Sequence, residues 1–139
     1  MIRLRLAWAR LFVASTCAAA IGLATWGCQA VRVIEFRREV DTNVSGPVTL
    51  VNELVVDDGE EKRFLATWGR VAEYMRAQPG FVSTRLHRGV GGSSRWLNYA
   101  VWASAADFRR AIDKPEFRAL AAAIPARASP HLYQSVAEL

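Results

Sequence analysis

The chain has 139 residues, of which 52% are hydrophobic, enough to build one domain with a substantial core. Its formal charge is +5, but residues 1–46 hold six arginines against three acidic side chains, whereas residues 47–139 hold twelve basic against ten acidic side chains. The larger part of the chain is therefore nearly neutral and has no basic stripe, which argues against a nucleic-acid-binding protein.

The first 31 residues differ in composition from the rest. Three arginines, at positions 3, 5 and 10, precede a run without any charged side chain over residues 11–31. This run has about the length that crosses a membrane, and a basic start followed by an apolar segment is also typical of an export signal. We predict an N-terminal apolar helix within residues 1–31, acting as a signal peptide or membrane anchor of a bacterial envelope protein. A cytoplasmic protein with a misassigned start is the alternative.

Both cysteines, Cys17 and Cys28, lie in this N-terminal segment. The sequence G-C-Q at 27–29 resembles the lipid-attachment site of bacterial lipoproteins, although Thr25 and Trp26 depart from that pattern. Lipidation of Cys28 therefore stays an open alternative. The rest of the chain has no cysteine, and its His, Asp and Glu residues show no metal-binding spacing, so we expect no disulfide and no metal site there.

Residues 32–46 are mixed and polar and end in D-T-N-V-S-G directly before Pro47, which predicts a linker before a domain at 47–139. Residues 47–56 are β-branched and apolar, as in a strand. Residues 60–78 then carry apolar side chains at helical spacing, and the helix is expected to stop at Pro79-Gly80.

Alternation predicts strands over 81–88 and 95–103, joined by a glycine-rich loop. Ser104 is placed to cap a helix, a second helical segment starts at Pro115, and a last short strand is expected over 131–136. The order β-α-β-β-α-β predicts an α+β, ferredoxin-like domain with helices on one face of an antiparallel sheet. Because the strands are apolar on both faces, we also expect a homodimer formed through the sheet faces.

Two side chains on the strand at 95–103 are the first candidates for catalysis. Asn98 and Trp102 share one strand face, roughly 13 Å apart. A buried amide costs about 1–3 kcal/mol unless it finds a partner, and none is evident nearby in the sequence. Asn98 could donate to a substrate oxygen, and Trp102 could pack on an aromatic ring and donate through its indole N–H. The alternative is that Asn98 secures a bulge and Trp102 is core.

Four further residues are candidates at the same site. Asn52 lies mid-strand among apolar neighbours, and Trp68 and Tyr74 lie on the first helix; these three could contact a small aromatic ligand. His87 titrates near neutral pH and could act as a general base. A purely structural or solvated position is the alternative for each of the four.

Three stretches resemble the antibiotic biosynthesis monooxygenase domain: F-L-A-T-W-G-R-V-A-E-Y-M-R-A-Q-P-G-F-V-S-T-R-L-H-R, then W-L-N-Y-A-V-W-A-S, then F-R-R-A. The resemblance extends from Pro47 to about Val136. It implies a dimeric α/β barrel with a ligand cavity between each protomer's sheet and helices. It also implies oxidation of polycyclic, quinone-forming aromatics by molecular oxygen without metal or flavin. Asn98 and Trp102 match the pair found in such cofactor-free monooxygenases.

Other members of this family degrade haem, using a histidine on the late helix as the iron ligand and a tryptophan one helix earlier. Counted from Trp102, these two positions are Ala121 and Ala111, so both side chains are missing. We therefore predict a monooxygenase of small aromatic substrates that needs no cofactor. A non-catalytic small-molecule-binding protein on the same barrel is the alternative, and haem degradation is disfavoured.

Overall fold

The computed structural model describes residues 34–137. The predicted N-terminal apolar helix, Cys17 and Cys28 lie outside the described residues. Within the described part of the chain, no helix is long and apolar enough to cross a membrane. The described residues belong to one compact unit.

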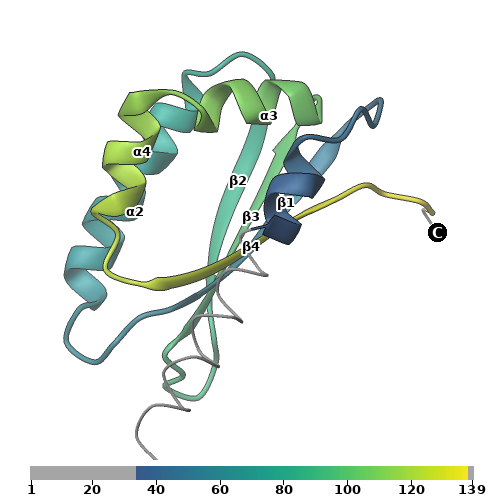
Figure 1. Ribbon diagram of the computed structural model, residues 1–139. Helices are drawn as coiled ribbons and strands as arrows, with labels where there is room; N and C mark the ends of the chain where they lie inside the picture. Colours follow the sequence, from purple (N-terminus) through teal and green to yellow (C-terminus); the bar gives the residue numbers. More distant parts are fainter. Residues whose placement is uncertain (1–33, 138–139) are drawn as a thin grey trace, which may run out of the picture. The chain divides into compact units, whose positions relative to one another are not determined.

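A four-stranded antiparallel sheet is the base of this unit, and its strand order is β2-β3-β1-β4. Three helices lie on one face of the sheet (Figure 1). The predicted ferredoxin-like order is confirmed, with these bounds: β1 Val48–Val55, α2 Glu61–Arg76, β2 Phe81–Arg88, β3 Arg95–Trp102, α3 Ala105–Ile112, α4 Pro115–Ala122 and β4 Arg127–Tyr133.

Individual residues at the helix ends explain where the helices begin and where the chain turns after them. The Ser104 hydroxyl accepts the backbone N–H of Asp107 and so caps α3, as predicted. Pro115 opens α4, where its missing N–H has no helical partner to lose. Between α2 and β2, Gly80 has φ +81°, a value that glycine adopts without the steric cost of a side chain.

Strand β4 differs from its prediction. It begins at Arg127 and ends at Tyr133, so Pro130 lies inside the strand instead of ahead of it. An edge strand accepts a proline because one row of its N–H groups has no strand to bond. The N–H of Leu132, two residues on, points to that free edge and bonds the Glu39 carboxylate, so the missing N–H of Pro130 belongs to the same unpaired row.

The segment predicted as a linker is helical over residues 34–40. Val40 is completely buried in the core, and Phe36 packs against the same core cluster. Phe36 and Val40 are four residues apart, so they lie on one face of the helix. The folded unit therefore starts upstream of Pro47, and the apolar pair within an otherwise polar segment is the reason.

Two hydrophobic clusters lie along the inner face of the sheet. The first surrounds Trp102 and Phe108, and the second surrounds Phe64 and Trp96. On β1, Leu50 belongs to the first cluster and Leu54 to the second. Asn52 lies between these two leucines. Along β1, apolar packing on the inner face is thus interrupted at one polar position.

Candidate active site

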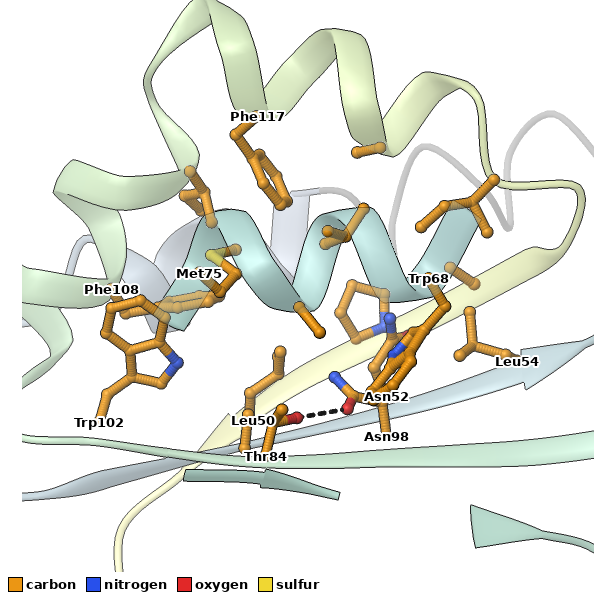
Figure 2. Close-up of a pocket in the computed structure, with 18 of the residues that line it drawn as sticks. Leu50, Asn52, Leu54, Trp68, Met75, Thr84, Asn98, Trp102, Phe108 and Phe117 are labelled. Atoms are coloured by element: carbon orange, nitrogen blue, oxygen red, sulfur yellow. Dashed lines mark hydrogen bonds between the residues drawn. The ribbon is translucent and has the colours of Figure 1, made fainter. Parts of the chain in front are cut away.

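A cavity of about 280 Å³ lies between the sheet and the helices. This is close to the lower end of the roughly 300–1,000 Å³ typical of small-molecule sites. Its walls are almost entirely aliphatic or aromatic, and Figure 2 shows Phe117, Met75 and Phe108 above the strands. A site of this kind suits a small, mostly apolar ligand.

The polar side chains of the wall are few and come mainly from the sheet. They are Asn52, Thr84 and Asn98, together with the indole N–H groups of Trp68 and Trp102. Among the described lining residues, none is Asp, Glu, His, Lys, Arg, Cys or Tyr. The described wall can therefore donate and accept hydrogen bonds, but it offers no group that exchanges a proton near neutral pH.

Asn98 is oriented by a side chain of the neighbouring strand. The Thr84 hydroxyl donates to Asn98 Oδ1 at 2.8 Å, drawn as the dashed line in Figure 2. The backbone oxygen of Tyr99 lies 3.3 Å from the same hydroxyl, at a longer distance. With its carbonyl held by Thr84, the amide has its two N–H donors left for the cavity.

Asn52 supplies the complementary atom. It pairs directly with Asn98 across β1 and β3, so both amides project from the inner face side by side. Asn52 Oδ1 is buried and has no hydrogen-bond partner among the described residues. The residue opposite on β4 is Pro130, whose side chain has no hydrogen-bond donor to offer. An unpartnered buried carbonyl costs about 1–3 kcal/mol, and a ligand hydroxyl would remove that cost.

Trp102 is both a core residue and part of the cavity wall. It is 1% exposed, and its ring meets Phe81 and Phe108 edge-on at centroid distances of 5.5 and 5.4 Å. The nitrogen-bearing edge of the indole faces the interior of the cavity (Figure 2). The two interpretations of Trp102 from the sequence are therefore compatible, because packing fixes the ring that a ligand would touch.

A β-bulge decides which side chains of β2 reach the cavity. The register between β2 and β3 shifts between Phe81 and Ser83. Phe81 and Thr84 consequently both line the cavity, although strict alternation would put them on opposite faces. The bulge thus delivers the hydroxyl that orients Asn98.

Two sequence candidates are not brought to the cavity. His87 alternates with the inward-facing Leu86 and is exposed on the other face of the sheet, so it is not placed to act as a base here. Tyr74 is not part of the cavity wall, because its hydroxyl donates to the backbone oxygen of Ala111 at 3.0 Å. Burial, with a smaller effect of Glu116, raises the pKa of Tyr74, so this phenol stays protonated.

The structure brings together Asn52, Trp68, Asn98 and Trp102 as the sequence predicted, and it adds Thr84 and Phe36. From the sequence alone, Thr84 is recognisable only as a residue on the inner face of its strand. Its hydrogen bond to Asn98 depends on the register between β2 and β3, which the sequence does not give. Ala121 lines the cavity and Ala111 is buried, so neither haem-specific side chain is present. No cluster of metal-binding side chains occurs among the described residues.

Comparison with known proteins agrees with this fold and site. Residues 47–123 match the antibiotic biosynthesis monooxygenase family. Deoxynogalonate monooxygenase of Streptomyces nogalater is 37% identical over 79 residues, which are 57% of this chain and 66% of that protein. The 42.8 kDa protein in the whiE locus of Streptomyces coelicolor is 33% identical over 50% of this chain and 17% of that protein. The chain thus spans just under two thirds of the first of these relatives.

Solved structures give the same grouping. SnoaB, a cofactor-independent oxygenase from Streptomyces nogalater, superposes with a TM-score of 0.64 at 31% identity, over 68% of this chain and 98% of SnoaB. A protein from Shewanella loihica PV-4 superposes with a TM-score of 0.59 at 31% identity, over 69% of this chain and all of that one. With a family match over more than half its length, the chain belongs to the antibiotic biosynthesis monooxygenase family.

Proposed function

We propose that the chain is a monooxygenase that uses molecular oxygen without a cofactor to oxidise small, quinone-forming aromatics such as hydroxyanthrones. The observation that carries the proposal is the pair of amides in an otherwise apolar cavity. Asn98, held by Thr84 at 2.8 Å, presents N–H donors, and Asn52 presents a buried carbonyl that has no partner within residues 34–137. A phenol beside a carbonyl on one aromatic edge offers the matching acceptor and donor.

For this reaction the protein needs only to bind the substrate and to stabilise the negative charge of the substrate anion. An anthrone-type CH₂ group becomes a carbonyl; one atom of O₂ enters the product, and the other leaves as water with the two displaced hydrogens. The substrate must first lose a proton. Since no described lining side chain is a base, the acidity of the substrate itself would supply the anion, and the apolar wall would disfavour that anion unless Asn98 donates to it.

Oxygen uptake with hydroxyanthrones of different acidity tests the proposal. We expect uptake whose pH midpoint moves with the pKa of the substrate, because the protein contributes no titrating group at the described wall. Asn98→Ala should lower turnover by about 10²–10³, as loss of one oxyanion donor typically does. Uptake that is absent with every member of the series would contradict the proposal.

A non-catalytic binding protein is the second candidate, and the lack of a base in the described wall is what favours it. Binding of the same aromatics under air, with neither oxygen uptake nor product, would establish this alternative. The two functions share every contact described above and differ only in turnover.

We also propose that the outer face of the sheet pairs with a second copy of the chain. Val51, Leu97 and Val101 are half-buried apolar side chains on that face, and Tyr99 beside them is 41% exposed. No described helix covers this face. Light scattering on residues 32–139 should give twice the protomer mass, and a stable monomer at micromolar concentration would refute the pairing.

For the N-terminal run 11–31, which lies outside the described residues, we propose membrane attachment or export. Its length and lack of charge are the support. Fractionation of cells producing the tagged full-length chain tests this, and recovery of uncleaved protein entirely in the cytoplasmic fraction would refute it.

A further inference from the structure

One cavity residue comes from upstream of the region that matches the family. The match begins at residue 47, whereas Phe36 lies on the helical segment 34–40 and still lines the cavity. The other lining residues begin at Leu50. The described part of this chain thus completes its cavity with an element that precedes the family domain.

Several contacts fasten this helical segment to the domain. Val40 is fully buried in the core. Both carboxylate oxygens of Glu39 are engaged at the edge strand β4: one accepts the N–H of Leu132 at 2.8 Å, and the other lies 3.1 Å from Nδ1 of His131. Such contacts also cover a strand edge that would otherwise be open. The segment is therefore held in place from the β4 side.

The opposite side of the segment is held by charge. Arg37 bonds Asp113 at 2.9 Å, in the turn between α3 and α4, and also bonds Asp41 at 3.1 Å. These pairs are exposed, so each contributes little by itself. Of the two pairs, only the one with Asp113 joins the segment to another element, and Phe36 packs against the core cluster and lines the cavity.

The ring of Phe36 meets Phe108 edge-on at a centroid distance of 6.2 Å, and Phe108 meets Trp102 at 5.4 Å. A series of three aromatic rings thus runs from the catalytic candidate Trp102 to the added helix. We propose that Phe36 is a specificity-determining residue: its ring limits how far an aromatic ligand extends past Phe108. This inference rests on the proposed function for the class of ligand.

The test compares ligands of graded size on the full-length chain. Hydroxynaphthalene and hydroxytetracene differ in ring number but share the phenol. Their affinities are measured without oxygen, by quenching of tryptophan fluorescence, so no ligand is consumed. Phe36→Ala removes the ring, and Ile34→Ala is the matched control, because Ile34 lies on the same helix, is 54% exposed and does not line the cavity.

We expect Phe36→Ala to favour the four-ring over the two-ring ligand by on the order of tenfold or more relative to wild type, the scale on which apolar pockets discriminate. Phe36→Trp should shift the preference the opposite way, and Ile34→Ala should not shift it. The tryptophan variant keeps an aromatic side chain on the core, so loosening of the helix cannot account for opposite shifts in the two variants. A size preference that is the same in wild type and both Phe36 variants, or that Ile34→Ala changes equally, would overturn the inference.

The same preparations separate this inference from the proposed function. A Phe36-dependent size preference in binding, together with no oxygen uptake from any hydroxyanthrone, supports the role of Phe36 and overturns the oxygenase. Oxygen uptake from a hydroxyanthrone, together with a size preference that the Phe36 variants do not change, supports the oxygenase and overturns the role of Phe36. Failure of the wild-type chain to bind either aromatic, together with no oxygen uptake from any hydroxyanthrone, overturns both.

Discussion

The hydrogen bond between Thr84 and Asn98 gives the sharpest test of how the site works. Thr84→Val keeps the shape of the side chain but removes the hydroxyl that donates to Asn98 Oδ1 at 2.8 Å. A hydrogen bond of this kind contributes about 1 kcal/mol. That corresponds to roughly fivefold in the ratio of amides with their N–H donors toward the cavity to amides turned the other way. Turnover should therefore fall by at most about fivefold, far less than on deleting the amide.

The assay is oxygen uptake with a hydroxyanthrone, run beside melting temperatures on the same preparations. Thr84→Ser keeps the hydroxyl and should restore most of the turnover that Thr84→Val loses. In an Asn98→Ala background there is no amide to orient, so Thr84→Val should have no further effect. If Thr84→Val reduced turnover equally with and without Asn98, then Thr84 would act by another route and the orientation argument would be refuted.

Four further outcomes follow from the same geometry. Asn52→Leu replaces a buried carbonyl that has no partner in the described part of the chain, so the melting temperature should rise while affinity for hydroxyanthrones falls; a lower melting temperature would show that the amide is satisfied. Trp102→Ala should lose about 3–5 kcal/mol of unfolding free energy in denaturant titration, because the ring is 1% exposed, whereas Trp102→Phe should lose less and mainly slow turnover. The hydrogen bond from Arg37 lowers the pKa of Asp113, so the stability it contributes is complete above the unfolded pKa of about 3.9 and disappears as the pH falls through the folded value. Asp113→Asn should remove the part of the stability loss at low pH that comes from protonation of Asp113. Identical acid unfolding curves for wild type and Asp113→Asn would contradict the pairing. His87→Ala should leave oxygen uptake unchanged, since the imidazole lies on the other face of the sheet; a large loss would return His87 to the mechanism.

Local periodicity determined most of the architecture. Alternation in the strands and helical spacing in 60–78 are properties of neighbouring residues. They therefore predicted the order of the elements and a layer of helices on one face of the sheet. The same alternation placed Asn98 and Trp102 on one face and Asn52 on an apolar face. Where a prediction failed locally, as at Pro130, the reason was that strand β4 is an edge, which depends on its neighbours in the sheet.

The tertiary structure decided how those faces combine. The bulge after Phe81 and the register between β2 and β3 bring Thr84 to Asn98 and leave His87 outside. Phe36 reaches the cavity because Glu39 meets a strand more than ninety residues away in the chain. Strand register and the docking of distant segments depend on contacts between residues far apart in sequence, which local periodicity does not encode. The amino-acid sequence thus determined which side chains face the interior, and only the fold determined which of them meet.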